Sequence, residues 1–461
     1  MIRVLLFLPL LLIFGCTSQE KKSLDVFFAG EIVNPTGDKV VLYKGDKVID
    51  SAALDKNNRF SFQFDSIPEG LYHFDHAPEL QYVYLANGDS LVIRLNTMDF
   101  DESLVFSGSG SDVNNFLLEL FLANEEEDSK IAAWYELEAS EFLEKIDALQ
   151  DEKIETLMEL ISEGNLSQNQ RNLAKASIVY NYNTYKEQYP FRHGRHSEHG
   201  VFEKLPDEFY QYRKSVEYGN EHLTYLRPYY EFMVNHIQNL SFMGCKEECK
   251  MKENVVQNQL HFNEHKLLLI DSLVSEKELK DNLYRYVAFN YLLKAHDFSE
   301  NNKQFITKFH ELSNNNRHLQ EIDELYEGIE NLQPQKSIPN IYVTNFSGDS
   351  ISLREIAKEG KTVFYFWSGV DKKHFNNIKR RVFELTLKNP EYKYVGINMK
   401  TNEATWKGML EESRLNKDLQ YKANDFSELT KSLIIFPENK CVITKDALIV
   451  DAFSNIYASF R

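Results

Sequence analysis

The residues with the clearest chemical potential are among the four cysteines of this 461-residue chain. Cys245 and Cys249 lie one helical turn apart, or in a short loop if Gly244 ends the preceding helix. Two thiols at this spacing can form a local disulfide, exchange electrons with another disulfide, or supply two ligands to a metal. An oxidising compartment favours the disulfide, and the redox-active and metal-binding pairs stay open as alternatives. Cys441 lies in an apolar run, where we expect a small core side chain.

Three histidines, His193, His196 and His199, recur at every third position, a spacing that could hold a metal ion. The neighbouring Gly194 and Gly200 instead indicate a loop, so we predict no metal site and no cofactor. The sequence contains neither a phosphate-binding glycine loop nor a G-x-S-x-G nucleophile motif.

The composition excludes several classes of protein. Hydrophobic residues make up 43% and charged residues 26%, which is typical of a folded globular chain. The net charge of −18 argues against nucleic acid as a partner, because phosphate binding needs a basic surface. Four cysteines are too few for a disulfide-dense scaffold. The length suggests about three domains.

The N-terminus indicates the compartment. Residues 1–15 have one positive charge at Arg3 and an apolar run too short to span a bilayer, as in a secretory signal peptide. The run ends in Gly15-Cys16, which resembles the bacterial lipoprotein signal and implies acylation of Cys16. The alternative is an ordinary signal peptide with a chance cysteine. We expect a lipid anchor in a bacterial envelope, with the outer membrane favoured and either a periplasmic or a surface-facing body, and residues 16–23 as a polar tether.

Residues 24–110 show short β runs between turns. Phe60, Phe62 and Phe64 alternate with polar residues, and turn residues recur at intervals typical of a sandwich. We therefore predict an antiparallel β-sandwich. The segment resembles the small sandwich domain at the head of many Bacteroidetes lipoproteins, which brings no known catalytic residues. The phrases that carry this resemblance are Gly30-Glu31-Ile32, Asn58 to Phe62, Pro68 to Tyr72, Leu85 to Leu91 and Phe106 to Gly110.

Residues 111–331 have helical periodicity. One apolar stripe from Phe142 to Ile161 is ended by Gly164, and Ser167 to Gln170 has the spacing of a capping box. Further stripes cover Tyr225 to Ile237, Val255 to Leu273 and Leu283 to Leu293. We interpret the acidic run 125–128 as a solvated face. Two prolines then mark residues 332–340 as a linker.

Residues 341–461 alternate strands and helices, starting with a buried strand over 362–367, a polar helix from Lys372 and a second strand over 394–398. This pattern predicts parallel pairing. The segment resembles the thioredoxin fold of the TlpA/ResA type, membrane-tethered thiol-disulfide oxidoreductases outside the cytoplasm. The phrases that carry the resemblance are Phe366-Trp367-Ser368, Gly396-Ile397-Asn398, Ala404 to Lys407 and Phe436-Pro437. The resemblance implies that Pro437 is a cis residue facing the active site.

The cysteine pair of that family is replaced. Val370 stands at the motif tryptophan, Asp371 at the attacking cysteine and His374 at the resolving cysteine. A carboxylate cannot form the mixed disulfide that the family reaction needs, so that reaction is excluded at this position. We interpret Asp371 as an N-cap on the amide of Lys373 or His374. The alternative is an Asp/His pair acting as acid and base or as half of a metal site.

The sequence thus predicts a multidomain α+β protein with an N-terminal β-sandwich, a central helical domain and a C-terminal thioredoxin-like α/β domain. The predicted function is an envelope protein that binds or assembles extracytoplasmic proteins or peptides on the surface around Asp371 and Pro437. The alternative is an enzyme, either a thiol-disulfide oxidoreductase acting through Cys245 and Cys249 or a hydrolase using Asp371 and His374.

Overall fold

The computed structural model describes residues 24–460 apart from positions 165, 194–204, 246, 250, 253–254, 296, 298 and 437–438. Within these residues, no helix is both long and apolar enough to cross a membrane. The chain divides into two compact units. The first contains the described residues up to Ser215 together with Asn220–Phe232, and the second contains Val216–Gly219 and the residues from Met233 onward. The division falls inside the helical segment and not at residue 110 or 332.

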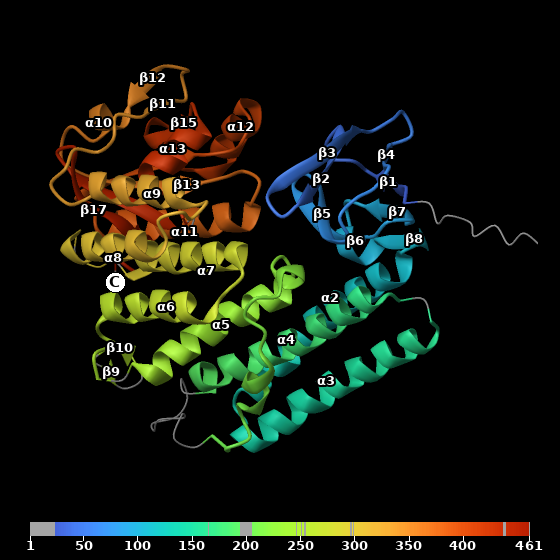
Figure 1. Cartoon of the computed structure of the whole chain (residues 1–461). Helices are drawn as coiled ribbons and strands as arrows, with labels where there is room; N and C mark the ends of the chain where they lie inside the picture. Colours follow the sequence, from blue (N-terminus) through green and yellow to red (C-terminus); the bar gives the residue numbers. More distant parts are fainter. Residues whose placement is uncertain are drawn as a thin grey trace, which may run out of the picture. The chain divides into compact units, whose positions relative to one another are not determined.

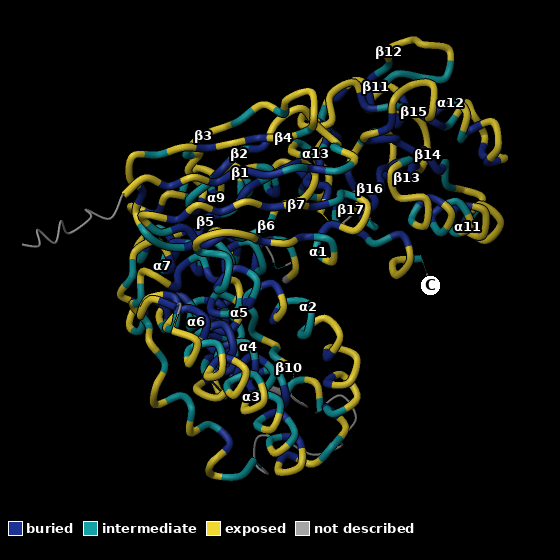
Figure 2. The backbone as a smooth tube through the Cα atoms, turned by 90° about the vertical axis from the view of Figure 1, so that its right-hand side faces the viewer, coloured by how far each residue is buried: buried dark blue, intermediate teal, exposed yellow. Residues whose placement is uncertain are grey.

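Two four-stranded sheets form the sandwich of the first unit. The first sheet has the order β4 (Arg59–Phe64), β1 (Val26–Val33), β7 (Ser90–Asn96), β8 (Val105–Ser109). The second has the order β3 (Lys47–Ala53), β2 (Lys39–Lys44), β5 (Gly70–His76), β6 (Glu79–Leu85). Buried and exposed positions alternate along β4 and β7 (Figure 2). One apolar core with Phe28, Phe62 and Phe74 fills the space between the sheets.

The sequence predicts a wholly antiparallel sandwich, but one pair of strands runs parallel. β1 and β7 run parallel, with Phe28 opposite Leu91 and Ile32 opposite Leu95. The prediction is wrong at this pair because the chain leaves the first sheet after β4, builds β5 and β6 of the other sheet, and returns beside β1 in the same direction.

Three long helices follow in the first unit: α2 (Ser111–Trp134), α3 (Ala139–Ser162) and α4 (Gln168–His193), packed side by side (Figure 1). A short helix, α1 (Phe100–Ser103), precedes them, and two 3₁₀ turns, Gln211–Ser215 and Glu221–Leu223, follow. The predicted capping box is present, since Gln170 Oε1 accepts from the Ser167 amide at 2.8 Å and Ser167 Oγ accepts from the Gln170 amide at 3.3 Å.

The acidic run 125–128 is not a uniformly solvated face. Glu127 is only 6% exposed. Its carboxylate accepts from the Tyr182 hydroxyl at 2.7 Å and lies 3.0 Å from Lys153 Nζ. The prediction is wrong at this residue because three helices meet there, so a carboxylate on α2 is covered by partners on α3 and α4.

The second unit begins with a layer of helices. They are most of α5 (Arg227–Gly244), α6 (Gln259–Leu273), α7 (Lys277–Asn290), a π-helical turn Tyr291–Ala295, α8 (Ser299–Leu312) and α9 (Leu319–Asn331). A two-stranded hairpin, β9 (Met251–Lys252) and β10 (Val255–Val256), precedes α6. The predicted helical stripe from Val255 therefore starts as a strand, and α6 begins only after its N-cap Asn258.

A seven-stranded sheet forms the rest of the second unit. Its order is β12 (Ser350–Ser352), β11 (Tyr342–Thr344), β15 (Gln420–Ala423), β14 (Tyr392–Asn398), β13 (Lys361–Trp367), β16 (Lys440–Lys445), β17 (Leu448–Asn455). The helices are α10 (Leu353–Ile356), α11 (Lys372–Lys388), α12 (Glu403–Ser413), a 3₁₀ turn Lys417–Leu419 and α13 (Phe426–Leu433). β13, β14 and β15 run parallel, and antiparallel pairs add β16 and β17 at one edge and β11 and β12 at the other. Strands and helices alternate around a parallel core of three strands, as the sequence predicts.

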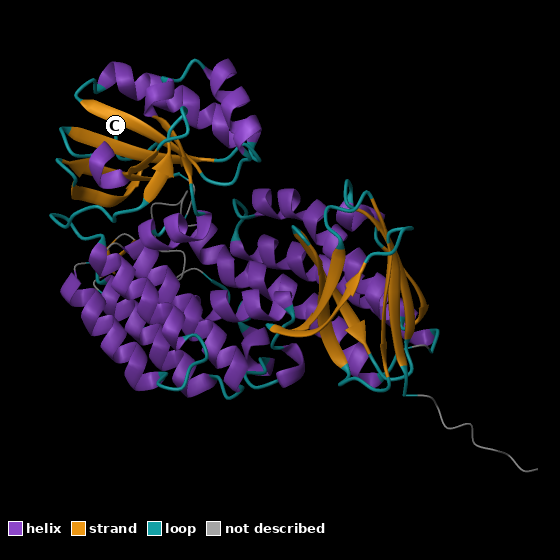
Figure 3. Cartoon of the chain, turned by 90° about the horizontal axis from the view of Figure 1, so that it is seen from above, coloured by secondary structure: helices purple, strands orange, loops and turns teal. Residues whose placement is uncertain are grey.

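Helices α11 and α12 pack on one face of this sheet, on Val363, Tyr365 and Trp367 of β13 (Figure 3). The predicted linker at 332–340 is bonded to β17 and the turn before it. The Gln335 amide donates to the Ile449 carbonyl at 2.8 Å, and the Ile338 amide donates to the Ala447 carbonyl at 2.9 Å. Ile338 is fully buried, so this segment is part of the second unit's fold.

A buried lysine in this sheet gives a pH-dependent stability. Lys440 is 4% exposed, and its Nζ donates to the carbonyls of Leu433 at 2.6 Å and Ile434 at 2.8 Å. Burial lowers its pKa from 10.5 to about 7, with Asp451 opposing the change. Between these values the unfolded chain binds more protons than the folded chain, so the free energy of unfolding rises with pH.

We expect Lys440→Met to remove this contribution. The difference between wild type and variant in free energy of unfolding should change by about 1 kcal/mol per pH unit between pH 7 and 10, in favour of wild type at high pH. Urea unfolding at several pH values measures it. Lys445→Met, at the exposed end of the same strand, is the matched control. Parallel pH profiles for wild type and Lys440→Met would contradict the assignment.

Candidate functional site

Asp371 and His374, where the resemblance implies a replaced cysteine pair, lie at the start of α11, after β13. Asp371 is the N-cap, and its Oδ1 accepts from the His374 amide at 2.8 Å. This is the capping role that the sequence predicts. The preceding loop is held by the Gly369 amide, which donates to Thr401 Oγ1 at 2.6 Å. Val370 is 80% exposed, so an apolar side chain projects beside the helix end.

No cysteine lies at this helix end in the described part of the chain, and the sulfur near Gly369 is that of Met409. Cys441 is buried on β16, opposite Tyr365, and burial raises the pKa of its thiol to about 12. It is a core side chain, as predicted. The loop before β16 reaches the same end of β13, because Cys441 pairs with Tyr365 in an antiparallel register. Pro437 in that loop lies outside the described residues, and the neighbouring Phe436 is 67% exposed.

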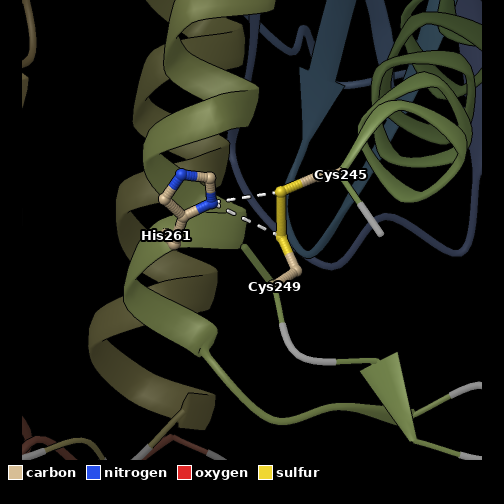
Figure 4. Close-up of side chains that lie close together, drawn as sticks. All are labelled: Cys245, Cys249 and His261. Carbon is tan, nitrogen blue, oxygen red and sulfur yellow. Dashed lines mark hydrogen bonds between the residues drawn. A yellow bond between two sulfur atoms is a disulfide. The ribbon is translucent and has the colours of Figure 1, made fainter. Parts of the chain in front are cut away.

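The other cysteine pair forms a disulfide. Cys245 and Cys249 are joined with a Cα–Cα distance of 5.7 Å, and both are buried, at 2% and 0% exposure. His261, on the first turn of α6, points its Nδ1 at both sulfurs, 3.0 Å from Cys245 Sγ and 3.6 Å from Cys249 Sγ (Figure 4). These three residues are the group of potential metal ligands that comes together within the described residues, and Asp371 and His374 are not in it. His261 was not among the site residues predicted from the sequence.

The remaining predicted sites are mostly outside the described residues. Cys16 precedes residue 24, and His196 and His199 fall in 194–204. His193 is described, and its Nδ1 lies 2.9 Å from the Tyr135 carbonyl oxygen and 3.2 Å from the Tyr189 hydroxyl. It therefore has a structural role at the end of α4.

The sequence did not reveal a cleft of about 740 Å³ in the first unit. β6, α2, α4 and the start of α5 line it. The lining carboxylates are Glu79, Asp101, Glu125, Asp128 and Glu231, and the lining cations are Arg192 and Arg227. Arg227 pairs with Glu231 at 2.8 Å, which leaves an acidic excess. Burial and then the carboxylates of Glu125, Glu102 and Glu79 raise the pKa of Asp101.

One wall of the cleft is the backbone of an edge strand. β6 pairs with β5 on one side and is the last strand of its sheet. At Tyr84 the outward side is covered by Asn114, whose Oδ1 accepts from the Tyr84 amide at 2.7 Å and whose Nδ2 donates to the Tyr84 carbonyl at 3.0 Å. Backbone groups of a strand alternate in direction, so those of Tyr82 and Leu80 point outward in the same way. The Tyr82 amide already donates to Gln81 Oε1 at 2.7 Å, and Gln81 Nε2 donates to Asp101 Oδ1 at 2.9 Å. Leu80 is 50% exposed.

Comparison with known proteins gives similarity in structure only. No family model matches the chain, and no curated protein matches it. A putative thiol-disulfide oxidoreductase from Bacteroides vulgatus is 16% identical over 28% of this chain and 92% of its own, with a TM-score of 0.24. A thiol:disulfide interchange protein from Bacteroides sp. is 18% identical over 26% and 80%, with a TM-score of 0.23. A thioredoxin-like protein from Bacteroides caccae is 11% identical over 43% and 75%, with a TM-score of 0.33. Matches at this level say nothing about activity.

Proposed function

We propose that this chain is a lipid-anchored envelope protein that binds extended segments of extracytoplasmic proteins or peptides, and that its thioredoxin-like domain has no redox role. The observation that carries the proposal is the edge strand β6 along an acidic cleft. An added peptide strand would bond to the outward backbone groups of Leu80 and to the Tyr82 carbonyl, as in other cases of strand addition. At the Tyr82 amide the peptide carbonyl would replace Gln81 Oε1 as acceptor. The acidic excess favours a segment with Lys or Arg side chains.

The binding experiment uses two labelled peptides of equal length, one alternating Val and Lys and the other alternating Val and Glu. We expect the basic peptide to bind the full chain and the acidic peptide to bind at least tenfold more weakly, measured by fluorescence anisotropy. The double variant Asp101→Asn/Glu125→Gln should lower the affinity for the basic peptide by about tenfold. Glu155→Gln/Glu159→Gln makes the same charge change on the exposed side of α3 and should have no effect.

A second variant tests the backbone contribution. Leu80→Pro removes one outward amide of β6 and leaves the charges in place. It should weaken the basic peptide while far-ultraviolet circular dichroism stays that of wild type. Equal affinity for both peptides, or affinity that none of these cleft variants changes, would refute the cleft as the binding site.

The lipid anchor is tested independently. Cys16→Ser should abolish incorporation of labelled palmitate and move the protein from the membrane fraction to the soluble fraction of the producing cells. Ser18→Ala, two residues along the tether, is the matched control. Membrane retention of Cys16→Ser would contradict acylation at this residue and leave the peptide-binding proposal untouched.

The second candidate function is thiol-disulfide exchange at Cys245 and Cys249, which His261 favours by lying against both sulfurs. Exchange requires an attacking thiolate to reach a sulfur, and both sulfurs belong to residues that are 2% exposed or less. The binding function is therefore the better supported. An insulin-reduction assay separates the two, because turnover that a Cys245→Ser/Cys249→Ser variant abolishes would establish the exchange activity.

A further inference from the structure

Four residues of the second unit have the chemistry and spacing of a zinc site. The sequence is Cys245-x₃-Cys249-x₁₁-His261-x₃-His265, close to the spacing of Cys₂His₂ sites. A short hairpin, β9 and β10, lies between the cysteines and α6, which carries both histidines one turn apart. The ligand atoms of Cys245, Cys249 and His261 lie within 4.8 Å of one another. Two cysteine sulfurs and one imidazole nitrogen this close together suit a metal ion that prefers tetrahedral coordination by soft ligands.

A fourth donor lies next to this group. A Cβ placed on Gly244 would come 3.2 Å from His265 Cε1 and 3.9 Å from Nε2, so the His265 ring rests against the residue before Cys245. Ser241 Oγ lies 3.1 Å from His265 Nδ1, at hydrogen-bonding distance. The Nδ1 contact occupies one ring nitrogen, as outer-shell partners of zinc-bound histidines do. His265 lies outside the close group of three ligands, so its ring must turn toward the cysteine loop to become the fourth.

One residue connects the cysteine loop to the helix of the histidines. The backbone amide of Asn258 donates to the Cys249 carbonyl at 3.1 Å, and the side-chain Nδ2 of Asn258 donates to the Glu248 carbonyl at 3.2 Å. Its Oδ1 accepts from the His261 amide at 3.2 Å, as the N-cap of α6. None of these three hydrogen bonds uses a sulfur atom, so Asn258 connects Cys249 and His261 independently of the disulfide bond itself.

We propose that Cys245, Cys249 and His261, with His265 as fourth ligand, form a Zn²⁺ site when the disulfide is reduced. A dithiol reductant supplies two electrons and two protons, which breaks the S–S bond into two thiols, and the reductant becomes a disulfide. Zn²⁺ then binds both sulfurs as thiolates and displaces their two protons to solvent. The site goes beyond the proposed peptide binding and does not depend on it.

The experiment uses the full chain, reduced and freed of reductant without oxygen, and titrated with Co²⁺ and then Zn²⁺. We expect the reduced wild type to bind one Co²⁺ with the thiolate charge-transfer bands and visible bands of a tetrahedral site, and Zn²⁺ to displace it. The oxidised protein should give no such bands. Cys245→Ser/Cys249→Ser should abolish them, whereas Cys441→Ser should keep them.

Histidine variants test the other half of the site. His261→Ala should weaken Zn²⁺ binding at least 100-fold, and His310→Ala, whose Nε2 lies 2.7 Å from Asp323 on neighbouring helices, should not change it. Asn258→Ala, a positioning residue, should weaken binding by about 10- to 100-fold. If His261→Ala does not fold, the presence or absence of charge-transfer bands in the reduced wild type decides whether the metal site exists. Their absence, or their persistence at full strength in a folded His261→Ala protein, would overturn the proposal.

Discussion

The double variant Asp371→Cys/His374→Cys should reduce the disulfides of insulin, whereas wild type should not. In wild type the start of α11 offers an aspartate that caps the helix through the His374 amide. A thiolate placed at residue 371 would lie at the same helix end, where the free amides and the helix dipole stabilise negative charge and lower a thiol pKa. The second thiol, at i+3, would then resolve the mixed disulfide.

The place of the thiol pair in the domain should affect insulin reduction as much as its location at a helix N-terminus. The start of β16 lies beside the C-terminal end of β13, and Val370, next to the helix N-terminus, is exposed. A matched control exists in the same domain, because Asp425 caps α13 and its Oδ1 accepts from the Glu428 amide at 2.9 Å. Asp425→Cys/Glu428→Cys therefore builds the same thiol pair on another helix N-terminus.

We expect turbidity from insulin reduction only with the first variant, or at least tenfold faster with it than with the control. Equal rates would mean that any helix N-terminus serves, and that the α11 position has no special geometry. Loss of the Asp371 cap should lower the free energy of unfolding by about 1 kcal/mol. Thermal unfolding of both variants measures this loss, so a difference in rate can be separated from a difference in stability.

Local signals in the sequence predicted local structure well. The Ser167 and Gln170 capping box, the Asp371 cap and the Cys245–Cys249 disulfide all join residues at most four positions apart. Such features depend on chain geometry over one helical turn, so residue types at fixed spacing are enough to predict them.

Features that join distant segments could not be predicted in the same way. The cleft brings together residues from Leu71 to Glu231, and no periodicity marks them as neighbours. The parallel pair of β1 and β7 and the buried Glu127 likewise depend on which elements pack together. His261 and His265 are an intermediate case, because their spacing from the two cysteines could have been found in the sequence.

The second prediction with a large expected effect concerns the stability of α4, one of the helices that line the cleft. Replacing Arg213 with methionine should lower the free energy of unfolding of the first unit by about 3–5 kcal/mol. The Glu187 side chain on α4 is 0% exposed, and it accepts from Arg213 Nε at 2.9 Å and from Nη2 at 2.5 Å. The guanidinium also stacks on the Tyr210 ring at 3.6 Å. Without it, a buried carboxylate loses its counter-charge and two charge-assisted hydrogen bonds.

Two further variants separate charge from packing. Glu187→Met/Arg213→Met removes both charges and should recover most of the lost stability, because the desolvation cost is removed with the pair. Arg59→Met breaks the pair with Glu31, whose side chains are 63% and 35% exposed, and should cost no more than about 1 kcal/mol. Urea unfolding followed by circular dichroism measures all three, and a single Arg213→Met effect as small as that of Arg59→Met would contradict the buried-pair assignment.

The same variants connect stability to binding. Glu187 lies on α4 beside Thr184 and Gln188, which line the cleft, so its ion pair with Arg213 holds the helix that a peptide would contact. Arg213→Met should therefore also weaken the basic peptide several-fold at temperatures where the protein remains folded, and the double methionine variant should restore it. Weakening without restoration would mean that the guanidinium, and not the order of α4, contributes to binding.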